Sequence, residues 1–285
     1  MAEARCPASC GELLQGWLLG SEKLISCPID WYSTVSVEDG PPDPFERPMM
    51  REALRRVLAR CGLPDESHRG LRIQFDSSIP VAKGMASSTA DIAATAMATA
   101  RHLGQNLDEP DLARLCVAME PTDSTIFRDL TLFDHNRGDI IAQHPWSPDL
   151  SLLILESPTQ LITADYHRRD RQAALLSGAA ILAQAWRLFE AAMLRQDLHC
   201  LGQATTLSAL ASQSLLPKPG FAALLDLLVS EDLLGINLAH SGTVVGLLLA
   251  PNQDEERLLS RIRQGELGRL YPQQHRVKLT QGGVR

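Results

Sequence analysis

Several features that mark common protein classes are missing from this sequence of 285 residues. Its basic residues form no cluster and its formal net charge is -7, so a nucleic-acid-binding protein is not expected. The 6 cysteines include no CxxC pair and the 8 histidines show no metal-ligand spacing, which argues against a zinc site and a disulfide framework. Because a run of about 18 apolar residues and a secretory leader pattern are also missing, we expect a soluble, cytoplasmic protein without a membrane partner.

Two common phosphate-binding patterns are absent as well, the GxxxxGK[ST] loop and the GxGxxG fingerprint. Hydrophobic residues make up 45% of the chain, which is enough for a large core. Predicted strands and helices are interleaved in both halves, which favours an α+β protein with two layered subdomains. We place the subdomains at residues 1–148 and 149–285, because Pro145 and Pro148 mark a seam, and expect the active site in the cleft between them.

Hydrophobic periodicity and turn residues predict the individual elements. The expected helices cover residues 49–61, 87–103, 109–119, 170–193, 197–212, 220–229 and 254–263. The later expected strands cover residues 71–75, 140–146, 150–155 and 276–280, with a further pair flanking Ser241. Between residues 6 and 37 we expect short strands broken by turns at Gly11, Gly16, Gly20 and Pro28.

A glycine turn precedes the alanine-rich helix predicted from Ser87. Gly84 permits a left-handed backbone, and the small residues after it keep the main chain approachable. Amide groups in this turn, together with the helix N-terminus, would form a cradle for an anion such as a triphosphate. The alternative is an ordinary helix start with Ser87 as its cap, and the segment alone does not decide between the two.

The segment resembles the second motif of the GHMP kinases, which reads Pro, three residues, Gly, Leu, small, Ser, Ser, Ala. The matching positions are Pro80, Gly84, Ala86, Ser87 and Ser88, with Met85 in place of Leu and Thr89 in place of Ala. In that family the loop wraps the phosphates of ATP, and a motif serine helps to hold Mg²⁺. The resemblance implies ATP and Mg²⁺ as ligands, with Ser87 or Ser88 near the metal and Ser87 close to the reaction. The residues expected to bind ATP are Pro80, Lys83, Gly84, Met85, Ala86, Ser87, Ser88 and Thr89.

The N-terminal segment from Cys6 to Gly16 resembles the first GHMP motif, which contributes to the acceptor site. Its sequence Pro-Ala-Ser-Cys-Gly-Glu-Leu is similar to that found in the L-threonine kinases of cobalamin synthesis, a branch of this family. The resemblance implies L-threonine as acceptor and O-phospho-L-threonine as product, with homoserine as the nearest rival. Ser9, Glu12 and Gln15 carry the groups to bind an ammonium and a hydroxyl. A glycine-bounded hairpin with outward polar residues is the alternative.

Two carboxylates, Glu120 and Asp123, stand three residues apart where Pro121 ends the second helix. Mg²⁺ prefers hard oxygen ligands and usually keeps waters and substrate phosphates in its shell. Glu120 and one motif serine are therefore enough protein ligands for it. A positioned Asp accepts or orients the hydroxyl proton during phosphoryl transfer, which makes Asp123 the catalytic candidate. Many GHMP kinases carry such a pair, but some homoserine kinases work without the base, so a purely positioning role for Asp123 stays open. An ordinary turn at the helix end is the alternative.

The segment Asn237–Ala250 resembles the third GHMP motif, although the family usually has more glycine here. Two strand-like runs flank His240 and Ser241, which we take as acceptor-site candidates. A simple hairpin with a structural histidine is an equal alternative.

The three ordered motifs and the acidic pair predict an ATP-dependent kinase that acts on a small molecule. The competing interpretation is a catalytically inactive GHMP-fold module that binds a ligand or a partner protein. Oligomeric state cannot be read from these patterns.

Overall fold

The computed structural model describes residues 1–161 and 170–285, in which nine strands form one sheet. The strands are β1 (Ala2–Leu18), β2 (Ser21–Asp39), β3 (Leu71–Ser77), β4 (Leu130–Asp134), β5 (Asp139–His144), β6 (Ser151–Glu156), β7 (Gly235–Leu238), β8 (Val245–Leu248) and β9 (Gln273–Lys278). Their order is β5-β4-β2-β1-β7-β8-β6-β9, with β3 also paired to β2. Every pairing is antiparallel, so neighbouring strands are joined by turns or by helical excursions.

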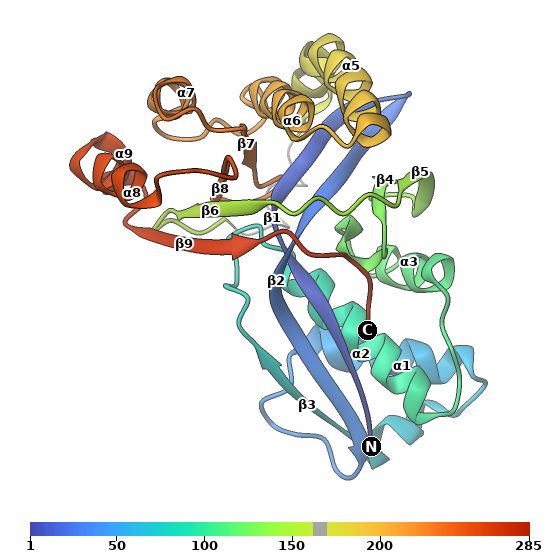
Figure 1. The fold of residues 1–285 in the computed structure, drawn as a ribbon. Coiled ribbons are helices and arrows are strands. Elements are labelled where there is room, and N and C mark those ends of the chain that lie inside the picture. The colour runs from blue at the N-terminus through green and yellow to red at the C-terminus, as the bar shows by residue number, and fades with distance from the viewer. Residues whose placement is uncertain (162–169) are drawn as a thin grey trace.

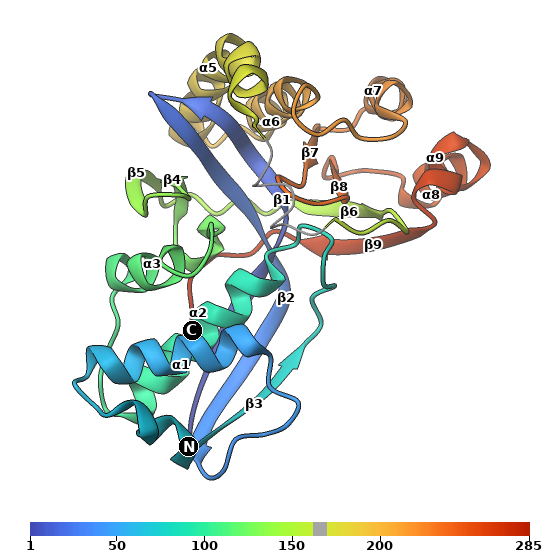
Figure 2. The same ribbon diagram turned by 180° about the vertical axis from the view of Figure 1, so that it is seen from behind.

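The helices of the described segments pack against this sheet in two groups. They are α1 (Pro48–Arg60), α2 (Ser87–His102), α3 (Glu109–Val117), α5 (Gln172–Arg195), α6 (Leu198–Ser212), α7 (Phe221–Ser230), α8 (Glu255–Gln264) and α9 (Glu266–Leu270), with 3₁₀ turns η1 (Asp65–Gly70) and η2 (Ser124–Ile126). Helices α1, α2 and α3 lie together at one end of the long β1–β2 hairpin, and α5 and α6 lie across its other end (Figures 1 and 2). Helices α7, α8 and α9 accompany β7, β8, β6 and β9 to one side.

Helix α2 owes its place in the centre to its composition. Its residues from Thr89 to Ala100 are buried, and most of them are alanine or threonine. Small side chains let the helix lie close to β1 and β2, and an alanine-rich sequence also has high helix propensity. The N-terminus of α2 is thereby held against the middle of the hairpin, where the first motif runs (Figure 2).

The expectation of short strands between residues 6 and 37 is wrong. Gly11, Gly16 and Pro28 lie inside two long strands, and only Gly20 falls in the turn between them. Irregular register at Pro7/Ala8 and between Ser9 and Leu14 absorbs the residues that do not fit a regular ladder. Gly11 therefore marks a β-bulge where we expected a turn, whereas Gly16 pairs in regular register with Lys23.

The predicted helices agree with the structure to within a few residues, whereas strand β4 was not predicted. The division at residue 148 stays a prediction, because a single sheet contains strands from both sides of it. The C-terminal residue Arg285 also returns to pair its backbone with Arg5 at the start of β1. Within the described segments, every helix is too short or too polar to cross a membrane.

Candidate active site

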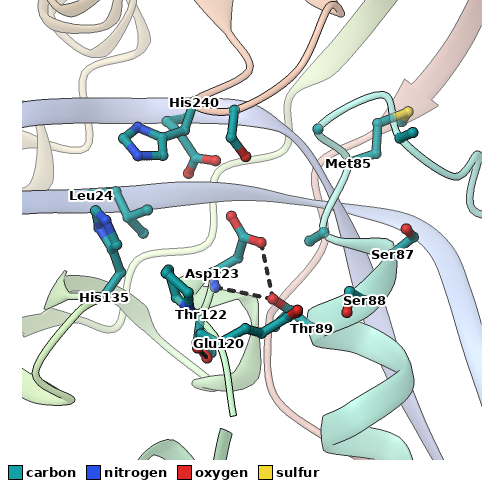
Figure 3. A pocket seen from close by; sticks show the side chains of 16 residues that line it. Leu24, Met85, Ser87, Ser88, Thr89, Glu120, Thr122, Asp123, His135 and His240 are labelled. Carbon is teal, nitrogen blue, oxygen red and sulfur yellow. Dashed lines mark hydrogen bonds between the residues drawn. The ribbon is translucent and has the colours of Figure 1, made fainter. Parts of the chain in front are cut away.

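A cavity of about 200 Å³ opens where the first, second and third motifs meet the acidic segment. Figure 3 shows Ser87, Ser88 and Thr89 at the start of α2 on one side, and His135 and His240 on the other. The sequence-predicted residues that line it are Glu12, Gly84, Met85, Ala86, Ser87, Ser88, Thr89, Glu120, Asp123, His240 and Ser241. The fold therefore brings together segments more than 200 residues apart in the sequence.

The loop before α2 has the backbone of an anion-binding nest. Ala82, Gly84 and Ala86 all have positive φ, at 60°, 78° and 60°. Left-handed residues alternating with ordinary ones turn successive N–H groups toward one point. Ala86 occupies the N-cap position of α2 and has no side-chain oxygen, so Ser87 is not the cap. The N–H groups of the first helical turn thus make no hydrogen bond to a capping side chain, which suits an anionic ligand.

The third motif packs on this loop backbone to backbone. A Cβ atom on Gly84 would lie 2.6 Å from Cα of Gly242, and one on Gly242 would lie 2.1 Å from the carbonyl oxygen of Lys83. The Thr243 N–H donates to that same carbonyl at 2.9 Å. The β7–β8 loop is therefore fixed against the loop that precedes α2, although it contains fewer glycines than the family pattern.

The first motif joins the same arrangement. Gly11 has φ +59°, and a Cβ there would lie 2.6 Å from the carbonyl carbon of Leu238 in β7. The Ser9 N–H donates to the carbonyl oxygen of Met85 at 3.1 Å. Side chains larger than hydrogen would separate these three segments, so the glycines determine how closely the cavity walls approach one another.

Asp123 is fixed by Thr89 from the first turn of α2. The Thr89 hydroxyl donates to Asp123 Oδ2 at 3.0 Å and accepts from the Asp123 N–H at 3.2 Å, as Figure 3 shows. Burial raises the pKa of the Asp123 carboxyl, and hydrogen bonds from Thr89 and Glu12 act in the opposite direction. A half-buried carboxylate held at both its side chain and its backbone is well placed to accept or orient a proton.

Glu120 lies beside the first turn of the same helix. Burial raises its pKa, and the nearby charges of Asp123 and Asp91 add to the rise. A hydrogen bond from Ser88 to the carboxylate acts in the opposite direction. Glu120 and Ser88 thus present hard oxygen atoms on one side of the cavity, which is the donor type that Mg²⁺ prefers.

Comparison with known proteins identifies the family. The model of the GHMP kinase N-terminal domain matches residues 49–127. An L-threonine kinase from Salmonella typhimurium is 56% identical over all of this chain and 95% of its own, and one from Citrobacter freundii is 54% identical over all of this chain and 99% of its own. The chain belongs to the GHMP kinase family. It is an ATP-dependent kinase.

Solved structures of more distant family members share the fold. Homoserine kinase from Cytophaga hutchinsonii superposes with a TM-score of 0.69 at 16% identity, covering 100% of this chain and 96% of the other. Mevalonate kinase from Methanococcus jannaschii superposes with a TM-score of 0.65 at 14% identity, covering 98% of each chain. These likenesses confirm the α+β fold predicted from the sequence.

Four predicted site residues of the kinase do not line the cavity. The Ser9 hydroxyl accepts from the Cys27 N–H at 3.1 Å and so joins β1 to β2. Lys83 Nζ donates to the carbonyl oxygen of Ser157 at 2.5 Å, away from the cavity. Gln15 supports the wall indirectly through His240, and Pro80 precedes the nest. We therefore assign none of these side chains to direct contact with a substrate.

Gln15 fixes the ring of His240. The Gln15 amide nitrogen donates to the carbonyl oxygen of Leu238 at 2.8 Å, so its oxygen faces His240 Nδ1 at 3.0 Å and accepts from it. His240 Nε2 faces a Glu22 carboxylate oxygen at 3.4 Å. Both ring nitrogens are thus directed at protein groups, and His240 forms part of the wall rather than a free ligand for the acceptor.

The sequence analysis missed His135, which lines the cavity from the end of β4. With Glu22 and His240 it forms a group whose ligand atoms lie within 4.8 Å of one another, spacing that a metal ion requires. Arg171 already pairs with both Glu22 oxygens, at 2.5 and 3.1 Å, so the carboxylate is neutralised by a guanidinium. We therefore interpret this group as a structural ion-pair network. Its members are too far apart in the sequence to give a motif.

Lys218, after α6, supports the third motif from behind. It is 5% exposed, and its Nζ donates to the carbonyl oxygens of Ala239 at 3.1 Å and Gly242 at 2.5 Å. Burial lowers the pKa of Lys218 to about 7. One ammonium group thus holds both ends of the loop that carries His240 and Ser241.

We expect Lys218→Met to lower the free energy of unfolding by about 2 kcal/mol, because two buried carbonyl groups lose their donor. The folded pKa of about 7 lies below the unfolded value, so the wild-type protein loses stability as pH falls toward about 7. The difference between wild type and variant should therefore be larger at alkaline pH than at pH 6. Urea unfolding at several pH values, with the exposed Lys278→Met as control, measures it; an equal loss in both variants would contradict the role.

Proposed function

We propose that this kinase transfers the γ-phosphoryl group of ATP to the hydroxyl group of L-threonine, giving O-phospho-L-threonine and ADP. The observation that carries the proposal is the identity of more than half of all residues with two L-threonine kinases over the full chain. The Pro-Ala-Ser-Cys-Gly-Glu-Leu segment, which resembles that of L-threonine kinases, forms a wall of the cavity through Glu12. A cytoplasmic role in cobalamin nucleotide-loop synthesis follows from the same resemblance.

The phosphate groups of ATP would bind the nest at residues 82–86 and the N-terminus of α2. Support comes from the three left-handed residues, the α2 N-terminus without a capping side chain, and the Gly84–Gly242 contact. Backbone N–H groups held in this way need no rearrangement when charge develops on the transferring group. Positioning and electrostatic stabilisation are the main contributions a protein makes to phosphoryl transfer.

The groups expected to hold Mg²⁺ are the carboxylate of Glu120 and the hydroxyl of Ser88, with Ser87 as a neighbour. Their contact and the elevated pKa of Glu120 support this, since a carboxylate among other acidic groups gains from a cation. When bound, Mg²⁺ neutralises phosphate charge.

The acceptor hydroxyl would lie between the nest and Asp123. Asp123 orients this hydroxyl and accepts its proton as the phosphoryl group arrives, while Thr89 keeps the carboxylate in place. Glu12, His240 and Ser241 form the remaining acceptor side of the cavity. A GHMP kinase for homoserine is the nearest alternative, because pocket shape alone separates two such similar amino acids.

The proposal is tested by ADP release with L-threonine, L-serine, L-homoserine and mevalonate as separate acceptors, each with and without Mg²⁺. We expect Mg²⁺-dependent turnover with L-threonine, and a product mass one phosphoryl group above threonine. Turnover with only one of the other acceptors would be consistent with a kinase but would reject L-threonine as its substrate. No ADP release with any of the four acceptors would favour the alternative of a catalytically inactive GHMP-fold module that binds a ligand.

A further inference from the structure

The cavity contains several acids and no fixed strong base. Glu12, Glu120 and Asp123 all line it, whereas no lysine or arginine does so among the described residues. The two buried lysines nearby, Lys83 and Lys218, donate to backbone carbonyls outside it. Three carboxyl groups around one small cavity are electrostatically unfavourable unless a proton or a cation is shared among them.

Glu12 is the most deeply placed of the three. Glu12 is 2% exposed, and its Oε2 atom has no hydrogen-bond partner among the described residues. Ser26, opposite it on β2, hydrogen-bonds the carboxyl, and Asp123 shares a hydrogen bond with it from the acidic segment. Two carboxyl groups make such a bond only when one of them is protonated.

The surroundings of Glu12 place the shared proton on Glu12. Burial and the charge of Asp123 raise the Glu12 pKa well above its ordinary value. The neighbouring titratable groups on β1 and β2, Cys10 and Cys27, have thiols whose pKa is also raised by burial, so they supply no cation. From β7 and β4 the cavity is faced by His240 and His135, which are engaged with Glu22.

We propose that the α-ammonium group of the amino-acid acceptor binds the Oε2 atom of Glu12, which is buried and has no hydrogen-bond partner among the described residues, and displaces the proton that Glu12 shares with Asp123. The ammonium group keeps its own protons, Glu12 becomes a carboxylate, and the displaced proton goes to solvent. No covalent bond forms or breaks in this step. The inference rests on the proposed function and adds how the site selects an amino acid.

The exchange has a direct consequence for Asp123. Before the acceptor binds, the Asp123 carboxylate accepts a hydrogen bond from protonated Glu12. Once Glu12 pairs with the ammonium group, that bond is lost and Asp123 has capacity for the acceptor hydroxyl. An alcohol without an ammonium group leaves Glu12 protonated and Asp123 occupied. The substrate itself therefore supplies the cation that makes the site competent.

Glu12→Gln is the informative variant, because the amide has the shape of protonated Glu12 and still donates to Asp123. We expect kcat/KM for L-threonine to fall by about 100-fold, because a neutral amide does not pair with an ammonium group. For (R)-3-hydroxybutyrate, which is threonine without its amino group, kcat/KM should change little. The ratio of kcat/KM for L-threonine to kcat/KM for (R)-3-hydroxybutyrate should therefore fall by about 100-fold. Glu3→Gln, an exposed change on the same strand, is the control and should leave the preference intact.

The pH profile gives a second test. In the wild-type enzyme, KM for L-threonine should rise about tenfold for each unit of pH below the raised Glu12 pKa, because one proton must leave on binding. In Glu12→Gln the same range should be flat. Ser26→Ala removes the hydrogen bond that lowers the Glu12 pKa, so it should move the rise in KM to higher pH without touching Glu12 itself.

The outcomes separate the inference from the function on which it rests. If the wild-type enzyme makes no O-phospho-L-threonine, the proposed function fails. If it does, but Glu12→Gln keeps the wild-type preference, or Ser26→Ala leaves the profile of KM unmoved, the ammonium-for-proton exchange is overturned. Circular dichroism of each variant verifies that it is folded.

Discussion

Replacement of Asp123 by Asn is expected to lower kcat for threonine phosphorylation by about 1,000-fold. The amide retains the size of the side chain and a contact with Thr89, but it does not accept the proton of the attacking hydroxyl. KM for ATP should change little, because Asp123 lies beyond the first turn of α2 and outside the nest at residues 82–86. Steady-state kinetics with saturating L-threonine and varied ATP measures both quantities.

The matched control for this variant is Asp76→Asn, an exposed carboxylate on β3. It should retain wild-type kcat and KM. A fall in kcat of less than about tenfold for Asp123→Asn would leave Asp123 a residue that positions the hydroxyl without accepting its proton. Wild-type kcat would contradict any role for Asp123 in the reaction.

Gly84→Ala should raise KM for ATP by at least about 100-fold, because a small displacement of reacting groups is sufficient for such losses. The added Cβ would lie 2.6 Å from Cα of Gly242 and 2.8 Å from Cβ of Ala239, and neither atom belongs to a flexible side chain. The nest must therefore open or the β7–β8 loop must move away. Equilibrium binding of an ATP analogue and kinetics measure the effect.

Gly62→Ala separates the steric effect from the backbone effect. Gly62 follows α1 with φ +72°, close to the +78° of Gly84, but no atom lies within 4 Å of the Cβ position. Alanine there should cost about 1 kcal/mol of stability, from the left-handed conformation alone, and leave KM for ATP unchanged. Equal effects of the two variants on KM would show that the Gly84–Gly242 contact does not shape the nest.

The features that were predictable from the sequence are those in which local residues determine the geometry. Gly84 followed by small residues and an alanine-rich helix specified a left-handed turn at a helix start. Pro121 likewise located Glu120 and Asp123 at the end of a short helix, and both line the cavity. In each case the chain neighbours of the residue, rather than distant segments, decide its conformation.

Side-chain direction was not predictable where distant segments decide it. Lys83 lies within the segment that resembles the second GHMP motif, yet its ammonium group reaches Glu156 at 3.3 Å on β6 instead of the cavity. Ser9 and Gln15 are used inside the fold because their partners on β2 and β7 lie next to β1. Lys218 showed no motif at all, since its role depends on carbonyl groups of the β7–β8 loop.

The strand pattern shows the same limit. Gly11 and Pro28 are residues that usually end strands, but both lie inside the long β1–β2 hairpin. The close approach of Leu238 to Gly11 explains why a glycine is needed there, and this contact depends on a strand more than 200 residues away. A turn and a bulge use the same residue types, so composition alone did not distinguish them.

The most direct test of the proposed reaction is a competition among acceptors. The purified kinase is incubated with Mg²⁺, ATP and equal concentrations of L-threonine, L-homoserine and L-serine, and the phosphorylated products are identified by mass and quantified against ADP. The account predicts O-phospho-L-threonine as the dominant product, formed in a one-to-one ratio with ADP. Phosphohomoserine as the dominant product, or ADP without any phosphorylated amino acid, would contradict it.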